Sequence, residues 1–453
     1  MNAALGGMLA YVLIQFLIGA WVSRRISSES DYILAGRRLG PGLTMFSVFA
    51  TYFGAEAIVA SGGAVYDKGL SGAVVDPMAY AGAIVLVGLG FARALWNRGL
   101  TTFADLFRER YSPGVERLVV IVLLPGSVIW AAAQVRAFGQ VMDANSNMGL
   151  STGIVLATVL VTMYAVVGGL LADAVTDLIQ GVAVLVGLLI LGSVVAAHVG
   201  GVSASLAHVT PAQLEVYDTA DGVLGTIEKL AVPICGTIVA VELISRFLGA
   251  RSAEVARNAT AVGGVVYLLI GLVPVFLGLV GPRLLPNVHD SEQTVARLAE
   301  IFLPGILYVA FVGAIVSAIL STVHSALHAP ASQISHNIVV RLIPHISSTG
   351  KVWAVRATVM ALCIVAFVIA ITSAGIHEIV ETASAFGSAG VFVVTLFALF
   401  TRFGGPVSAY LSIMSGLIFW AGGKYVFAVG TPYLIGLAAA ASAYVAGAFL
   451  QRD

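Results

Sequence analysis

One otherwise apolar stretch, residues 302–329 and the turn that follows, carries a stripe of hydroxyl side chains. They recur at the three- and four-residue spacing that places side chains on one face of an α-helix: Ser317, Ser321, Thr322, Ser325 and Ser332. Hydroxyl oxygens are hard ligands that suit a sodium ion. A single such hydroxyl often bonds to the preceding helical turn instead, but a whole stripe favours an ion site.

Two histidines, His324 and His328, lie four residues apart in the same stretch. That spacing can bind a transition metal, although no third ligand is evident nearby. Histidine also titrates near neutral pH, so the pair could make the protein sensitive to protons. A third interpretation is that both line a water-filled vestibule, and the sequence leaves all three open.

Five more ionisable side chains fall inside apolar segments, where a charge is costly and by default indicates function: Glu56, Asp76, Arg136, Asp177 and Glu242. A carboxylate such as Asp177 needs a cation, a basic partner or a proton there. The guanidinium of Arg136 could extend to the membrane surface, pair with a carboxylate, or bind an anionic substrate. Asp173 lies near a segment end, and we expect it to be interfacial.

Charge is scarce in this chain, which makes these groups informative. Of 453 residues, 59% are hydrophobic and only 10% are charged, against about 25% charged residues in a soluble domain. This excludes a soluble enzyme, a nucleic-acid-binding protein and a disordered protein. The net charge is zero, so no nucleic-acid partner is expected. Cys235 and Cys363 lie in apolar runs, so we expect neither a disulfide framework nor a metal cluster.

The apolar runs are long and continuous, which predicts an all-α polytopic membrane protein rather than a β-barrel. Arg24 and Arg25 follow the first run, the reverse of a signal peptide, so we expect a retained helix. Residues 1–453 then form a single transmembrane domain. Thirteen spans are predicted: 3–22, 41–65, 72–95, 117–141, 150–170, 174–199, 225–247, 260–281, 302–329, 353–373, 377–400, 405–422 and 430–450.

The distribution of basic residues sets the predicted orientation. Of 23 lysines and arginines, 17 fall on one side of the thirteen spans, including Arg246, Arg251 and Arg257 between spans 7 and 8. The loop at about 200–224 has none. We therefore predict an outside N-terminus, a cytoplasmic C-terminus and a multi-pass protein of the plasma membrane, such as a bacterial inner membrane.

The second predicted span is interrupted by Gly54, Gly62 and Gly63, with Glu56 near its middle. A discontinuous helix frees backbone carbonyls, which are good ligands for a hard cation. The alternative is a continuous helix whose glycines allow close helix packing.

Several motifs, in chain order, resemble the sodium:solute symporter family, which includes bacterial proline, sialic acid and sodium–galactose transporters. They are DYILAGRRLGP at 31–41, AQVRAFG at 133–139, GGLLADAVTDLIQ at 168–180, SRFLGARS at 245–252 and SAILSTVHSAL at 317–327. The resemblance implies the LeuT-type inverted-repeat fold. Its parts would be an extra first helix and loop (1–40), two repeats (41–199 and 225–400) and two C-terminal helices (401–453).

The resemblance also implies a sodium site between spans 2 and 9. Its ligands would be three backbone carbonyls and two hydroxyls, from Ala50, Phe53, Ala318, Ser321 and Thr322. No cofactor is expected beyond sodium as the coupling ion.

A second sodium site, present in some members, would use Asp177 and the hydroxyls of Ser325 and Ser321. His324 stands where a small hydroxyl residue is common in the family. A bulky or charged side chain there would exclude the ion or make transport pH-sensitive.

The implied substrate cavity lies between spans 2, 3, 4, 7 and 11. Ala57 stands where sugar-transporting members have a polar residue, which argues against a sugar. Some relatives bind a carboxylate through an arginine at or near Arg136, which favours a small carboxylate or an amino acid. The candidate lining residues are Tyr52, Glu56, Ala57, Asp76, Arg136, Glu242 and Phe386.

The predicted function is sodium-coupled symport of a small organic solute by alternating access. Its partners would be the solute, sodium and the lipid bilayer, with the oligomeric state left open. One alternative is a membrane solute sensor that works with a separate signalling partner. Another is a proton-coupled symporter, suggested by His324, Glu56 and Asp177.

Overall fold

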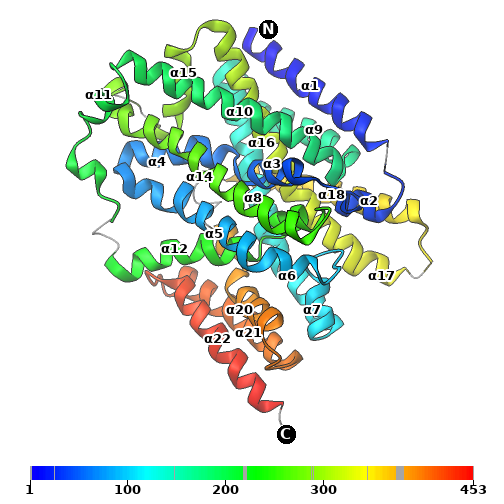
Figure 1. Ribbon diagram of the computed structural model, residues 1–453. Coiled ribbons are helices and arrows are strands. Elements are labelled where there is room, and N and C mark those ends of the chain that lie inside the picture. The colour runs from blue at the N-terminus through cyan, green and yellow to red at the C-terminus, as the bar shows by residue number, and fades with distance from the viewer. Residues whose placement is uncertain are drawn as a thin grey trace.

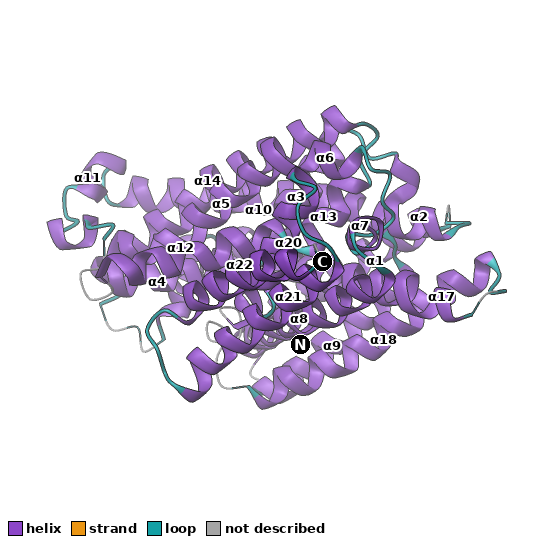
Figure 2. Ribbon diagram, turned by 90° about the horizontal axis from the view of Figure 1, so that it is seen from below, coloured by secondary structure: helices purple, strands orange, loops and turns teal. Residues whose placement is uncertain are grey.

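The computed structural model describes residues 3–24, 26–146, 148–217, 222–286, 288, 290–343, 345–373 and 382–451. Every regular element among these residues is a helix (Figures 1 and 2), apart from an isolated bridge between Leu39 and Ala250. The predicted all-α polytopic class is therefore confirmed.

Within the described residues, the apolar helices correspond to the thirteen predicted spans. Ten stretches are long and apolar enough to cross a membrane, and Ala10–Ser23 and Ser388–Phe400 are shorter apolar helices. One of the ten, Glu56–Trp96, contains the end of span 2 and all of span 3. The chain reverses inside it at Gly69, whose φ of +65° favours glycine. Residues 377–381, at the start of predicted span 11, lie outside the described residues.

The helices of the thirteen spans have the following bounds, in chain order: α1 (Ala3–Ser23); α3 (Pro41–Tyr52) with α4 (Ser61–Lys68); α5 (Tyr80–Leu86) with α6 (Arg93–Trp96); α8 (Pro113–Ser146); α9 (Leu150–Val167); α10 (Leu170–His198); α12 (Gly222–Ile238) with α13 (Val241–Leu248); α14 (Ala253–Leu284); α16 (Gly305–Ile334); α18 (Ser348–Thr372); α20 (Ser388–Phe400); α21 (Pro406–Ala421); and α22 (Pro432–Leu450).

Short helices lie at two opposite ends of this bundle. The helices α2 (Glu29–Leu34) and α17 (Val340–Leu342) lie at one end, and α11 (Val202–Leu206) lies at the other (Figures 1 and 2). The first end carries loops that the sequence assigns to the basic, cytoplasmic side. The second carries the loop at 200–224 that lacks basic residues.

Span 2 is broken in its middle, as the discontinuous-helix prediction requires. The helix α3 ends at Tyr52, Phe53 has a non-helical ψ of 63°, and helical structure resumes at Glu56. The N–H of Gly54 donates to Tyr52 O at 2.9 Å. It is therefore turned away from Ala50 O, its usual helical acceptor.

Span 7 is broken in the same way, which the sequence did not reveal. The helices α12 and α13 are separated at Ala240, whose ψ of 112° is extended. The first helix of each implied five-helix repeat is thus discontinuous. Discontinuous helices at corresponding positions are typical of inverted-repeat transporters.

Candidate ion and substrate sites

The break in span 2 faces the hydroxyl stripe of α16. Thr322 Oγ1 donates across this contact and lies 3.2 Å from Ala50 O and 3.1 Å from Ala318 O. These three oxygens belong to three of the five predicted sodium ligands. Phe53, the fourth, is the residue at which the α3 helix stops, so its backbone is also outside a regular helix.

Ser321, the fifth predicted ligand, donates its hydroxyl proton to Asp177 Oδ1. The other carboxylate oxygen, Oδ2, accepts from Ser47 Oγ at 2.6 Å. All three side chains are buried. Because a hydroxyl that donates its proton keeps its lone pairs, Ser321 can still offer its oxygen to a cation beside Thr322.

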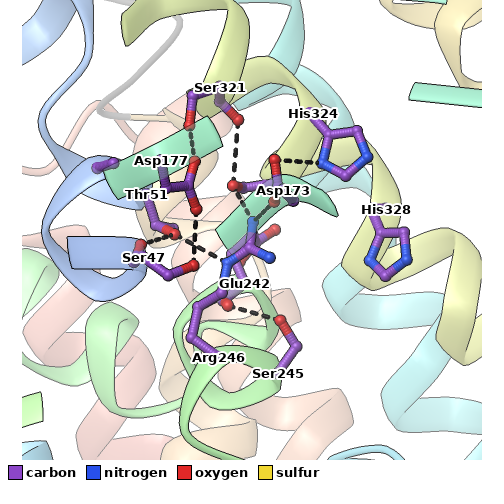
Figure 3. A network of polar contacts seen from close by, with 12 residues as sticks. Ser47, Thr51, Asp173, Asp177, Glu242, Ser245, Arg246, Ser321, His324 and His328 are labelled. Atoms are coloured by element: carbon purple, nitrogen blue, oxygen red, sulfur yellow. Dashed lines mark hydrogen bonds and ion pairs between the residues drawn. The ribbon is translucent and has the colours of Figure 1, made fainter. Parts of the chain in front are cut away.

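Of the three predicted ligands of the second sodium site, Asp177 and Ser321 contact each other, but the Ser325 hydroxyl has another partner. The hydroxyl of Ser325 accepts from Arg246 Nη2 rather than facing Asp177. The same Nη2 pairs with Asp173 Oδ2 (Figure 3), and Arg246 Nε donates to Thr51 Oγ1 at 3.0 Å. A protein cation is therefore bonded to Ser325, one of the three ligands that the resemblance implied for a second ion.

Arg246 and Asp173 correct two expectations from the sequence. Arg246 was counted with the cytoplasmic loops and Asp173 was expected to be interfacial, yet each has only 1% of its surface exposed. The extended backbone at Gly168 and Gly169 starts α10 inside the protein. Asp173 thus sits in the first helical turn, where the helix dipole favours a carboxylate and Arg246 neutralises it.

His324 and His328 are both buried, so they do not line an open vestibule. His324 Nδ1 lies 2.8 Å from Asp173 Oδ1, on the side opposite Arg246 (Figure 3). The two imidazole rings stack with centroids 5.3 Å apart, and His328 also contacts Tyr32 at 5.1 Å. The histidines therefore extend the polar network of Asp173.

A cavity of about 590 Å³, including its open mouth, lies at the two helix breaks. The five spans around it are the five that the resemblance implies. Four predicted residues line it, namely Tyr52, Glu56, Glu242 and Phe386. The other lining residues are Tyr80, Leu123, Gly126, Ser127, Trp130, Gly236, Thr237, Val239, Ala240, Val241, Ala383, Ser384 and Ser388.

Three predicted lining residues point elsewhere. Ala57 is buried outside the cavity. Asp76 Oδ1 accepts from the hydroxyl of Tyr267 at 2.8 Å, behind the lining. Arg136 Nη1 donates to Ala370 O at 3.0 Å, near the C-terminus of α18, where unpaired carbonyls attract a cation.

Aromatic rings and carboxylates give the cavity its chemistry. The ring centroid of Tyr52 lies 5.8 Å from those of both Tyr80 and Trp130. Among the described residues that line the cavity there are two carboxylates, Glu56 and Glu242, and no lysine, arginine or histidine. Glu242 Oε1 is buried and has no hydrogen-bond partner in the described part of the chain. The cavity is therefore suited to a positively charged ligand.

Tyr80 and Trp130 were not singled out from the sequence. An aromatic residue in an apolar span shows the same pattern whether it faces lipid, a helix or a cavity. The hydroxyl of Tyr80 forms a hydrogen bond of 2.9 Å with Ser384 Oγ, and this contact joins span 3 to span 11. Only the fold brings these segments together.

Known proteins agree with this architecture. The chain is 25% identical over 407 residues to high-affinity choline transporter 1 of Caenorhabditis elegans, covering 81% of this chain and 68% of that protein. It is 26% identical over 368 residues to the high-affinity proline transporter PutP of Bacillus subtilis, covering 78% of each. A solved Na+-coupled sialic acid symporter superimposes with a TM-score of 0.83 at 16% identity, covering 99% of this chain and 98% of that chain.

The likeness to the solved symporter shows the LeuT-type fold. These relatives are transporters, which agrees with the expectation from the sequence that the protein is not an enzyme. The Sodium:solute symporter family matches residues 32–445, which is most of the chain. The protein therefore belongs to the sodium:solute symporter family.

Proposed function

We propose that the protein couples the entry of sodium to the uptake of a small organic cation that carries an alkylated ammonium group. The observation that carries this proposal is the unpartnered Oε1 of Glu242 in an aromatic cavity without a basic lining residue. A buried carboxylate oxygen is costly unless a cation or a donor satisfies it. A cationic solute would supply that partner.

The aromatic lining supports the same solute class. Tyr52, Tyr80 and Trp130 all line the cavity, and the ring centroid of Tyr52 lies 5.8 Å from each of the other two. Aromatic cages of this kind bind alkylated ammonium ions, with about 0.5–2 kcal/mol gained per ring. The names of the choline transporters among the relatives fit this chemistry.

A zwitterionic amino acid is the second candidate, because a proline transporter is among the relatives. Its ammonium group would find Glu242, but its carboxylate would find no basic side chain in the described lining. The sequence-based preference for a carboxylate rested on Arg136, which does not line the cavity. We therefore expect a zwitterion to bind more weakly than a cation.

Sodium would act at the break in span 2. The proposed ligands Ala50 O and Thr322 Oγ1 lie beside that break, and the cavity residues Tyr52 and Glu56 are on either side of it. An ion there would order the segment that presents these two side chains to the solute, which links the two binding events. Each inward-moving positive charge gains about 2.3 kcal/mol per 100 mV of membrane potential.

Uptake into proteoliposomes tests the proposal. With an inward sodium gradient, we expect accumulation of radiolabelled choline that tetramethylammonium inhibits and that a potassium gradient does not drive. Sodium-driven uptake of a small monocarboxylate that tetramethylammonium leaves unaffected would contradict the solute class. Binding without flux would favour a sensor, and flux driven by a pH gradient without sodium would favour proton coupling.

A further inference from the structure

Two similar sets of polar groups lie one helical turn apart in the core. On α10 the carboxylates are Asp173 and Asp177, and on α16 the facing hydroxyls are Ser325 and Ser321. The two helices run antiparallel here, because Asp177 contacts Ser321 while the guanidinium that binds Asp173 also binds Ser325. A carboxylate and a serine therefore come together twice, bonded directly in one set and joined through Arg246 in the other.

The helix α3 adds a hydroxyl to each set. Ser47 donates to Asp177 Oδ2 at 2.6 Å, and Thr51 accepts from Arg246 Nε at 3.0 Å (Figure 3). The sets differ in one respect. Arg246 neutralises Asp173, whereas none of the ion pairs among the described residues includes Asp177.

We infer that the guanidinium of Arg246 takes the place of a second sodium ion, so that one sodium ion is carried per solute. The inference rests on the proposed sodium-coupled symport. The Ser325 hydroxyl, one of the ligands expected for a second ion, is already bound to Arg246. A free cation at Ser325 would also face a fixed like charge, which disfavours binding.

His324 closes the same place from the other side. Its ring is fully buried and lies 2.8 Å from Asp173 Oδ1. The resemblance implies a small hydroxyl residue at this position, and the imidazole of His324 supplies no ligand oxygen there. Two protein groups, Arg246 and His324, therefore flank the carboxylate of Asp173.

Asp177 has a different role on this view, as a positioning residue. By accepting the proton of Ser321, it orients the Ser321 oxygen so that the lone pairs are available beside Thr322. Carboxylates behind a ligand commonly act in this way, and their loss costs about 10–100-fold in ion affinity. One sodium ion beside Thr322 and the guanidinium of Arg246 at Asp173 thus give each of the two sets of polar groups one cation.

Equilibrium accumulation in proteoliposomes measures the number of coupled ions. With the voltage clamped at zero and a threefold sodium gradient, one ion supports about threefold accumulation of radiolabelled choline and two ions support about ninefold. We expect the threefold value. Ninefold accumulation would overturn the inference alone, while no sodium-driven accumulation would overturn the proposed function and the inference with it.

Sodium binding to the purified protein gives a second readout that needs no solute. The melting temperature is measured as sodium chloride is added, with potassium chloride as the control salt and no choline present. Its rise with sodium concentration should follow a Hill coefficient near one. We expect Ser325→Ala to change the half-saturating sodium concentration less than about twofold, and the matched Thr322→Ala to raise it about tenfold. An equal rise in both variants, or a Hill coefficient near two, would show that Ser325 binds a second ion.

Discussion

Two polar regions of the molecule are built differently. One is the cavity with its two carboxylates, Glu56 and Glu242. The other, which we call the end network, lies on the predicted cytoplasmic side and comprises Asp105, Glu116, Asn337 and Arg341. Asn337 Nδ2 donates to Asp105 and Glu116 at 2.9 and 2.8 Å, and Arg341 Nη2 lies 2.9 and 3.0 Å from the same carboxylates.

The two regions differ in whether their carboxylates have partners. In the end network each of these carboxylates has a basic partner, and Glu116 has a second one in Arg108 at 3.2 Å. In the cavity, Glu242 keeps an oxygen without a partner, and no basic side chain lines the described cavity. Buried carboxylates with basic partners stabilise the packing of helices, whereas a carboxylate oxygen without a partner is available to a ligand from solution.

The largest effect is expected for Glu242→Gln. The substitution keeps the size of the side chain but removes the charge, so the apparent affinity for a cationic solute should fall about a hundredfold, or about 2.7 kcal/mol. The melting temperature should stay the same or rise, because a buried unpaired charge is removed. Competition binding and thermal unfolding on the same preparation measure both quantities, and an affinity change below threefold would rule out Glu242 as the solute's partner.

Glu116→Gln should show the opposite pattern. The side chain is fully buried, and its loss of charge leaves Arg108 and Arg341 with weaker partners. We expect the free energy of unfolding to fall by about 2 kcal/mol, with the solute KM changed less than about twofold. Thermal unfolding and uptake kinetics test this, and a variant with weakened solute affinity but unchanged stability would erase the distinction between the two regions.

Much of the fold followed from the sequence because the membrane restricts the choices. Long apolar runs predicted thirteen spans. The glycines in span 2 left a broken and a continuous helix open, and the structure has the broken one, with the break at Phe53. The hydroxyl stripe indicated that α16 makes polar contacts, and Thr322 bonds to Ala50 O at the break in span 2 while Ser321 bonds to Asp177.

The pairing of charges did not follow from the sequence. The sequence assigned Arg246 to a loop and Arg136 to the substrate, but Arg246 is buried on Asp173 and Arg136 donates to Ala370 O. Their partners, Asp173 and Ala370 O, lie 73 and 234 positions away along the chain. Only the packing of the helices shows that Arg246 is committed to the core and that Arg136 is bound outside the cavity.

The smallest effect is expected at the edge of the end network, where Glu29 on α2 contacts His336 Nδ1 at 2.8 Å and Lys351 Nζ at 3.4 Å. Burial raises the pKa of Glu29, but the hydrogen bond and charge of His336 and the charge of Lys351 lower it by more, so the net pKa lies below the ordinary value of 4.5. A carboxyl whose pKa is lowered on folding stabilises the protein above its unfolded pKa. That stabilisation is lost as the pH falls through the folded pKa.

Glu29→Gln should therefore destabilise the protein by about 0.5 kcal/mol at pH 6, since the group is partly exposed. The difference from wild type should shrink as the pH falls through the lowered pKa of Glu29, because the wild-type carboxyl then becomes protonated as well. Thermal unfolding of both proteins across this range is the measurement, with uptake KM expected to be unchanged. A difference that grew as the pH fell would mean that Glu29 is held protonated in the fold, and the end network would then be as incomplete as the cavity.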